Sequence, residues 1–202
     1  MTANVLSVGS STSVASLWLI PRISEFLLWN RDIDVRLVVS DDEANLLSSS
    51  PDILVGYSDG RWPAYKSTRL FGDQIIPVCS PVFARNNGDL SVEMLVELSL
   101  IQLDRVSPSW TTWEDWLTAL SLPRGYLRGP IVSNYSIALQ AAELGLGVAL
   151  GWDKLIRPLM ADHRLVRLFH AFVESPTDFF LACRLDRTLS SPGLDLYEWL
   201  MR

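Results

Sequence analysis

Hydrophobic positions in this chain occur in short apolar runs and in stretches of helical period, separated by small polar turns. The clearest stretch begins with a short apolar strand at residues 131–132 and continues with Ser133 as a helix N-cap. A helix then runs to Leu144, and Gly145 supplies the left-handed residue that ends it. Residues 147–150 form the next strand, and a helical crossover of this length makes the two strands parallel. The apolar face expected of this helix contains Ile137, Ala138, Ala141, Ala142 and Leu144.

The beginning of the chain follows the same order of strand, polar turn and helix. We predict strands at residues 5–8, 34–39 and 52–56, and helices at residues 14–29 and 41–50. These segments form a second βαβ series. In open sheets of this kind ligands bind beyond the carboxyl ends of the strands, which places the candidate site at the polar turns.

The long helix expected at residues 14–29 carries two apolar stripes, which is more than one sheet can cover. We expect the stripe with Ile20, Ile23 and Leu27 to meet a second copy of the chain. The alternative is a helix buried between two layers of one subunit. Pro21 removes one backbone donor and should bend the helix unless it lies within the first turns.

The remaining apolar segments connect and complete the two series. An extended segment at residues 69–84 passes from the first series to the second, and Pro77 within it is tolerated only at a strand edge or a crossing point. Further helices are expected at residues 92–98, 110–120 and 194–201, and strands at residues 100–103, 165–168 and 178–184. Because the last strand and helix return to the first series, we predict two domains, of residues 1–76 with 180–202 and of residues 77–179.

With 49% hydrophobic and 20% charged residues over 202 positions, the composition is that of a globular protein. The net charge of −6 argues against nucleic-acid binding by this chain itself, because phosphate contacts need clustered Lys and Arg. No apolar run is long enough to span a membrane and no signal peptide precedes the first strand, so we expect a cytoplasmic protein. Cys79 and Cys183 lie in separate apolar runs and are expected to be buried thiols rather than a disulfide or a metal site.

The residues that catalysis requires are scarce. His163 and His170 are the only histidines, and both flank a predicted strand. We therefore predict neither a catalytic Ser–His pair nor a metal cluster. The sequence contains neither a G-x-S-x-G elbow nor a phosphate loop of the G-x-x-x-x-G-K type. We therefore expect no enzymatic activity and no cofactor.

Six motifs in order resemble one family, the effector-binding domains of LysR-type transcriptional regulators. The resemblance is greatest to the group that contains the glycine-cleavage activator and the β-lactamase regulator. The motifs cover nearly the whole chain and are L-I-P-R-I-S-E-F (19–26), D-I-D-V-R-L (32–37), P-D-I-L-V-G-Y-S-D-G-R-W (51–62), P-V-C-S-P (77–81), W-T-T-W-E-D-W-L (110–117) and A-A-E-L-G-L-G-V-A-L-G (141–151).

The resemblance implies an α/β fold of two Rossmann-like subdomains joined by two crossover strands, similar to type 2 periplasmic binding proteins. It implies a small-molecule effector in the inter-domain cleft, a homodimer, and a tetramer in the full-length regulator. The winged helix-turn-helix of the family would precede Val5, so DNA contact is expected only through that missing part. A solute-binding receptor of a transport system, which shares the two-lobed form, is the alternative function.

The resemblance also assigns ligand contacts to both subdomains. In the first they are Thr12 and Ser13 at the start of the first helix, and Gly56 and Tyr57 at a strand end. Helix N-termini favour anions, so we expect an anionic metabolite. The alternative for the hydroxyls is ordinary capping, which we expect of one of Ser11, Thr12 and Ser13.

In the second subdomain the implied contacts are Asn134 and Tyr135, with Ser133 as the cap, and Trp110 as a lip of the cleft. The alternative for Trp110 is core packing, which we expect of Trp113 and Trp116. Phe179 lies on the returning strand, where relatives can carry a polar aromatic residue. Because Phe has no hydroxyl, a ligand hydrogen bond is not expected from it.

Overall fold

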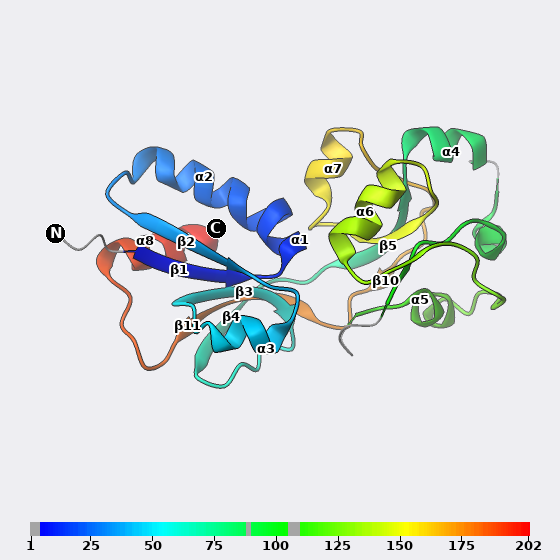
Figure 1. Ribbon diagram of the computed structural model, residues 1–202. Coiled ribbons are helices and arrows are strands. Elements are labelled where there is room, and N and C mark those ends of the chain that lie inside the picture. The colour runs from blue at the N-terminus through cyan, green and yellow to red at the C-terminus, as the bar shows by residue number, and fades with distance from the viewer. Residues whose placement is uncertain (1–4, 88–89, 105–109) are drawn as a thin grey trace. The chain divides into compact units, whose positions relative to one another are not determined.

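The computed structural model describes residues 5–87, 90–104 and 110–202 (Figure 1). The chain divides into two compact units, and each is described by itself. Unit 1 consists of Met1–Gly72 and Thr177–Arg202, and unit 2 consists of Asp73–Pro176.

Unit 1 is built on a five-stranded mixed sheet with the strand order β2-β1-β3-β11-β4. Strand β1 pairs in parallel with β2 and β3, whereas β11 runs antiparallel to both of its neighbours. The C-terminal segment therefore supplies an inner strand of the sheet. The strand bounds are β1 Val5–Ser10, β2 Asp34–Val39, β3 Ile53–Ser58, β4 Tyr65–Phe71 and β11 Asp178–Arg184.

Helices cover both faces of this sheet, and Figure 1 shows α2 and α3 on opposite sides of it. The first helical run consists of α1, a π-helical segment η1, and α2. Pro21 explains the π turn, because its ring would collide with the carbonyl four residues earlier in an α-helix. The bounds are α1 Thr12–Val14, η1 Ala15–Leu19, α2 Ile20–Trp29, α3 Glu43–Ser48 and α8 Ser191–Leu200.

The two stripes expected on the first helix have different surroundings. Ile23 and Phe26 are buried in the core of unit 1, whereas Ile20 is 44% exposed. The assignment of Ile23 to an outer face was therefore wrong. The reason is the π segment, which rotates the residues after it relative to those before it.

Unit 2 contains a sheet of the order β10-β5-β8, in which β9 also pairs with β5, and a separate pair β6-β7. Strands β6 and β7 are parallel, and a parallel bridge joins Leu100 to Val148 just before β8. The strand bounds are β5 Gln74–Cys79, β6 Gln102–Leu103, β7 Ile131–Val132, β8 Ala149–Trp152, β9 Val166–Arg167 and β10 Val173–Glu174. The helices are α4 Pro81–Asn87, the 3-10 helix η2 Val92–Glu97, α5 Trp113–Ala119, α6 Tyr135–Glu143 and α7 Arg157–Ala161.

The segment expected to be extended from residue 69 to residue 84 consists of β4, β5 and the beginning of α4. Pro77 lies inside β5, which has partners on both sides, so it is not on an edge strand, the first of its two expected places. The missing N–H is tolerated because β9 pairs with Val78 and Cys79 while β10 pairs with Gln74 and Ile75, which leaves Pro77 between the two partners.

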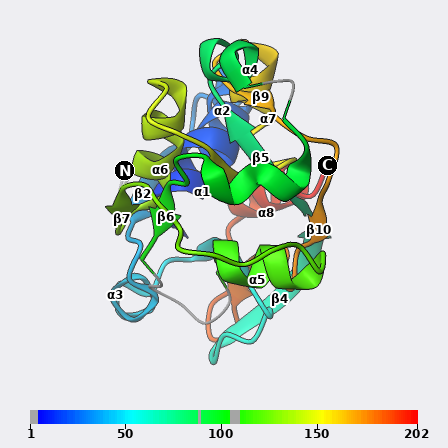
Figure 2. The same cartoon turned by 90° about the vertical axis from the view of Figure 1, so that its right-hand side faces the viewer.

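Helix α5 packs against β5, and Figure 2 shows α5 and α7 on opposite sides of that strand. Thr112 is the N-cap of α5 and forms a capping box with Asp115. Trp113 and Trp116 are buried, and their indole N–H groups donate to the carbonyls of Ile101 and Ile75 at 2.9 Å each. The core role expected of these two residues is confirmed.

Helix α6 differs from its prediction at both ends. Asn134, not Ser133, is the N-cap, and its side-chain oxygen accepts the N–H of Ile137 at 3.1 Å. Ile137 and Leu144 are exposed, because the buried face includes Tyr135 and Leu139 instead. Gly145 follows with φ of +81°, as expected of a residue that ends a helix.

Candidate functional site

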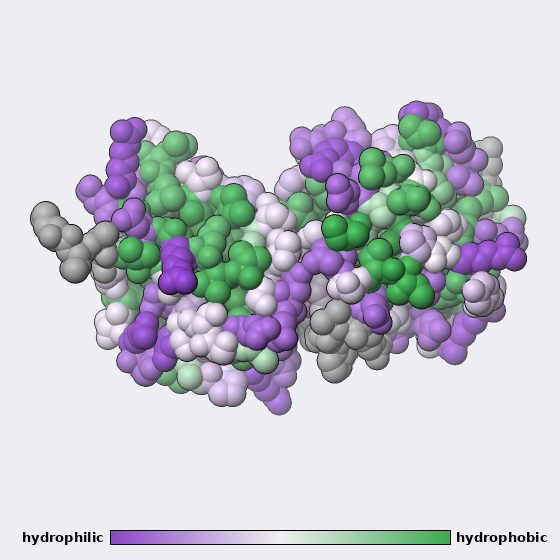
Figure 3. Space-filling view, viewed as in Figure 1, coloured by the Kyte–Doolittle hydropathy of each residue, from purple (hydrophilic) through white to green (hydrophobic). Residues whose placement is uncertain are grey.

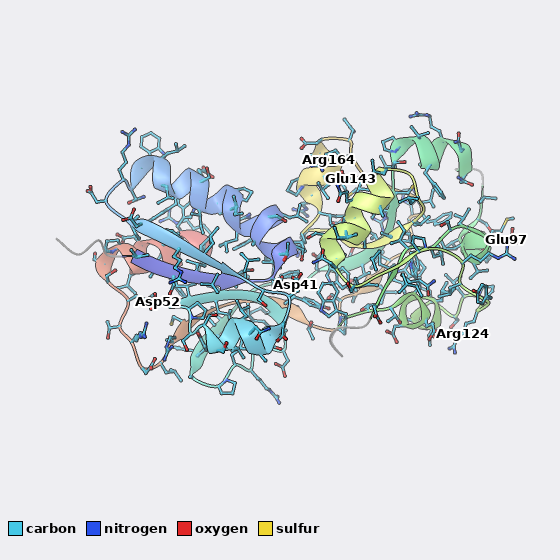
Figure 4. The ribbon with its side chains drawn as sticks, viewed as in Figure 1. Asp41, Asp52, Glu97, Arg124, Glu143 and Arg164 are labelled. Carbon is cyan, nitrogen blue, oxygen red and sulfur yellow. The ribbon has the colours of Figure 1, made fainter. Side chains whose placement is uncertain are left out.

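The carboxyl ends of the parallel strands β1, β2 and β3 meet at one edge of the sheet of unit 1. Thr12 follows β1 at this edge, and its N–H and hydroxyl both donate to the carboxylate of Asp41, which follows β2 (Figure 4). The two donor–acceptor distances are 2.8 Å to Oδ1 and 3.0 Å to Oδ2. A carboxylate is therefore already bound at the donors that the sequence assigns to an anionic ligand.

Asp41 also changes the expectation about capping. Ser11 is the N-cap of α1, but its side chain makes no capping hydrogen bond. The acceptor for the first helical N–H comes instead from Asp41, and a charged carboxylate is a stronger acceptor than a serine hydroxyl. The prediction that Ser11, Thr12 or Ser13 caps this helix through its own hydroxyl was wrong.

The two acidic residues after Asp41 have separate partners. Asp42 is the N-cap of α3 and accepts the N–H of Asn45 at 3.1 Å. Glu43 accepts the indole N–H of Trp62 at 2.5 Å. Trp62 in turn covers Gly56, because a Cβ built there would lie 3.1 Å from its ring. Each acidic side chain of this loop thus fixes a different neighbour.

Ser13 and Phe179 lie in the interior of unit 1, at 3% and 2% exposed. The ring of Phe179 packs between those of Tyr57 and Phe71, with centroid distances of 5.2 Å and 4.8 Å. Tyr57 is half-buried at the end of this aromatic row. Thr12 and Tyr57 have accessible surface, whereas Ser13 and Phe179 have almost none, and ligand contact by all four stays a prediction.

In unit 2 three aromatic residues meet edge to face beside the start of α6. Trp110 lies 5.3 Å from Tyr135 and 5.4 Å from Trp152 between ring centroids, and the last two rings are 5.2 Å apart. The Tyr135 hydroxyl accepts the backbone N–H of Trp152 at 3.1 Å. Tyr135 and Trp152 are buried while Trp110 is half-buried, so Trp110 offers the accessible face of the group.

The interior next to these rings is too small for an effector. A cavity of about 20 Å³ is lined by residues that include Thr111, Trp113 and Leu150, which is room for a single water molecule. Ser133 and Asn134, which precede α6 at Tyr135, lie outside this cavity, and ligand contact by them stays a prediction.

Residues suited to catalysis or metal binding do not gather at these positions. Among residues 5–87, 90–104 and 110–202, no group of three His, Cys, Asp or Glu side chains is placed to hold a metal ion. Both cysteines are free thiols, and burial raises the pKa of Cys79 to about 11. None of the described helices combines the length and hydropathy needed to cross a membrane.

Two units with polar helix starts at the carboxyl ends of parallel strands are typical of an α/β small-molecule-binding domain. The chain belongs to the LysR substrate binding domain family, whose family model matches residues 2–202.

Relatives and solved structures agree with this assignment. The chain is 31% identical over 198 residues to the glycine cleavage system transcriptional activator of Escherichia coli K12, covering 97% of this chain and 64% of the relative. It is 26% identical over 196 residues to the transcriptional activator AmpR of Rhodobacter capsulatus, covering 97% of this chain and 65% of that protein. The effector domain of AmpR from Pseudomonas aeruginosa superposes with a TM-score of 0.80 at 25% identity, covering 98% of this chain and 94% of that one.

These comparisons confirm the family and the fold class expected from the six motifs. The relatives are transcriptional regulators, which confirms the expectation that the chain is not an enzyme and favours the regulator over the transport receptor. The chain spans 64% of the length of the Escherichia coli relative.

Proposed function

We propose that this chain is the effector-sensing part of a LysR-type transcriptional regulator and binds a small anionic metabolite. The observation that carries the proposal is the carboxylate of Asp41 on the N–H and hydroxyl of Thr12, because donors that hold one carboxylate suit another. In unit 1 the proposed contacts are Thr12, Ser13 and Tyr57, and in unit 2 the proposed contact is Asn134. Contact with DNA belongs to a helix-turn-helix outside this chain.

The effector is found by a thermal-shift screen of amino acids, small carboxylates, aromatic acids and cell-wall fragments. A ligand at 100 times its dissociation constant stabilises the folded chain by about 2.7 kcal/mol, which such a screen detects. Calorimetry on the ligand so identified then measures the affinity of variants. A screen in which no member of these classes stabilises the chain contradicts the proposal.

Asn134→Ser is the variant that tests the site, because serine keeps the ability to cap α6 but removes the side-chain amide. We expect the affinity for the effector to fall by about 0.5–1.5 kcal/mol while the unfolding free energy changes little. Thr112→Ala is the matched control, since it removes a cap from α5 and should lower stability without changing affinity. Unchanged affinity in Asn134→Ser excludes Asn134 as a contact.

We also propose that the chain pairs with a second copy of itself through the outer surface of α2. Figure 3 shows hydrophobic side chains gathered over α2 and β2. On these two elements, Leu28 and Trp29 of α2 are 65% and 83% exposed, and Ile20 of α2 and Val39 of β2 are also exposed. An apolar patch of this kind is typical of an interaction surface.

A further inference from the structure

The surface of unit 2 has a hollow that contains none of the ligand contacts named above. It lies where three segments meet: the junction of β5 with α4, the end of α6 and the turn after α7. Its volume of about 580 Å³ is in the range of small-molecule sites, whereas the cavity beside Trp113 has room for a single water molecule. We call it the α4–α6 hollow, and its lining includes Ser80, Phe83, Glu143, Leu144, His163 and Arg164.

The guanidinium of Arg164 is held in the hollow by Glu143. Its Nε and Nη2 donate to Oε2 of Glu143 at 3.0 Å and 2.7 Å (Figure 4). The backbone is fixed as well, because the N–H of Arg164 donates to the carbonyl of Leu159 at 2.9 Å. These side-chain bonds use one edge of the guanidinium, and within the described part of the chain no residue accepts from its other edge. That edge, between Nη1 and Nη2, can bind a carboxylate through two parallel hydrogen bonds.

His163, next to Arg164, has a backbone conformation that glycine adopts more easily. Its φ is +54°, in the left-handed region, and its N–H donates to the carbonyl of Met160 at the end of α7 at 3.1 Å. A side chain in this conformation costs free energy relative to glycine, and residues of this kind gather at functional sites. The imidazole lines the hollow, and no described residue forms a hydrogen bond with it. His163 therefore offers a second polar group to a ligand in the hollow.

Apolar side chains form the rest of the lining. Val82 and Leu144 are 57% and 76% exposed, so both meet solvent at the hollow. Phe83 lies beside them, and its N–H donates to the hydroxyl of the buried Ser80 at 3.2 Å. A ligand that fits this lining has an apolar body as well as a polar group.

We propose that the α4–α6 hollow is a second binding site, which takes a small carboxylate with an apolar body. The carboxylate binds the free edge of Arg164, and the apolar body lies against Phe83 and Leu144. An amine fits less well, because the Glu143 side chain is only 15% exposed and its Oε2 already accepts two hydrogen bonds. The site is independent of the proposed effector contacts, since Asn134 lies at the other end of α6, a helix of nine residues and about 14 Å.

Benzoate and hexanoate test the proposal, because each joins a carboxylate to an apolar body. The backbone N–H signals of Gly145 and Arg164 are followed by nuclear magnetic resonance during titration of the 202-residue chain, at constant ionic strength set with chloride. We expect both signals to shift and saturate with at least one of the two acids. In Arg164→Lys the half-saturation concentration should rise at least about fivefold, because lysine keeps the charge but loses the second parallel hydrogen bond. Arg157→Lys is the matched control, since Arg157 is exposed at the start of α7 and outside the hollow, and it should bind as the unchanged chain does.

His163→Gly is a second variant, which does not touch the ion pair. Because glycine adopts the left-handed conformation freely, we expect an equal or higher midpoint of thermal unfolding together with a half-saturation concentration at least about twofold higher. A residue that serves only to end α7 would show no change in binding.

Four results overturn the proposal. They are the absence of a saturable shift at Gly145 and Arg164 with both acids, equal affinity in Arg164→Lys or in His163→Gly, saturation by the neutral benzamide at the concentration of benzoate, and a saturable shift confined to the N–H of Ile137. The last result places the carboxylate at the start of α6, which supports the proposed function and contradicts the second site alone.

Discussion

At the scale of single residues, Asp52 shows how one carboxylate fixes the far end of the sheet of unit 1. Its side chain accepts the N–H and the hydroxyl of Ser7 and pairs with Arg187 at 3.1 Å (Figure 4). Partial burial raises the pKa of Asp52, but the hydrogen bonds from Ser7 and the charge of Arg187 outweigh it, so the pKa lies below its ordinary value.

A pKa lowered in the folded state has a definite consequence for stability. The contribution of Asp52 is complete above the pKa of an unfolded aspartate, about 3.9, and is lost as the pH falls through the lower folded pKa. We expect Asp52→Asn to lower the unfolding free energy near neutral pH by about 1 kcal/mol and to flatten its decline below pH of about 4. Urea unfolding over this pH range measures both effects. A decline as steep as that of the unchanged chain contradicts the role of Asp52.

At the scale of elements, the turn from α6 into β8 depends on Gly147. A Cβ at this position would lie 2.2 Å from the carbonyl oxygen of Ser99, which itself accepts the N–H of Val148. The segments before β6 and β8 approach too closely here for any side chain.

We expect Gly147→Ala to destabilise the chain by at least about 2 kcal/mol, because the backbone of one segment must move. Gly125→Ala is the matched control, since a Cβ there meets no atom within 4 Å, and its effect should stay within about 0.5 kcal/mol. Equilibrium unfolding in urea compares the two variants. Equal stabilities would show that the close approach of the two segments does not exclude a side chain at residue 147.

Element positions could be predicted because strands and helices here have a strong apolar period. Strand β11 was predicted at its observed bounds, and β2 likewise, since polar residues interrupt the apolar pattern on both sides. The strand β10 was missed, because Val173 and Glu174 pair with β5 only through tertiary contact and have no pattern of their own. The π segment and the place of Pro77 also depend on neighbours that the local sequence does not show.

The candidate site could be predicted only in part, for a related reason. The order of strand, turn and helix located both helix starts to within two residues. The first helix was expected from residue 14 and begins at Thr12, and Ser133 was expected as the cap that Asn134 provides. The role of Asp41 does not follow from this order, because its partner lies 29 residues away and the contact needs the register of β1 with β2. The signal available was the acidic run Asp41-Asp42-Glu43 directly after a predicted strand, at the edge where ligands bind.

At the scale of the whole molecule, the pairing proposal can be tested by comparing substitutions at exposed and at buried positions of α2. Ile20→Glu and Leu28→Glu place a charge on the outer surface, and we expect each to convert a dimer at tens of micromolar into a monomer without unfolding it. Sedimentation measures the mass. Ile23→Glu differs, because Ile23 is 5% exposed and a buried charge should unfold unit 1.

The control is Val82→Glu, which puts the same charge on an exposed apolar position of α4 and should leave the dimer intact. If the unchanged chain is already a monomer, or if the dimer survives both Ile20→Glu and Leu28→Glu, the outer surface of α2 is not the dimer interface.

The inner position of β11 also sets an order of assembly during synthesis on the ribosome. All residues of unit 2 are made between residues 73 and 176, whereas the sheet of unit 1 lacks the strand between β3 and β4 until residues 178–184 have been translated. The nascent chain therefore presents β3 and β4 with open edges while unit 2 is already complete, and such edges are sites of wrong pairing. A stalled or prematurely ended translation product keeps a finished unit 2 joined to an unfinished unit 1, which is a substrate for chaperones and proteases.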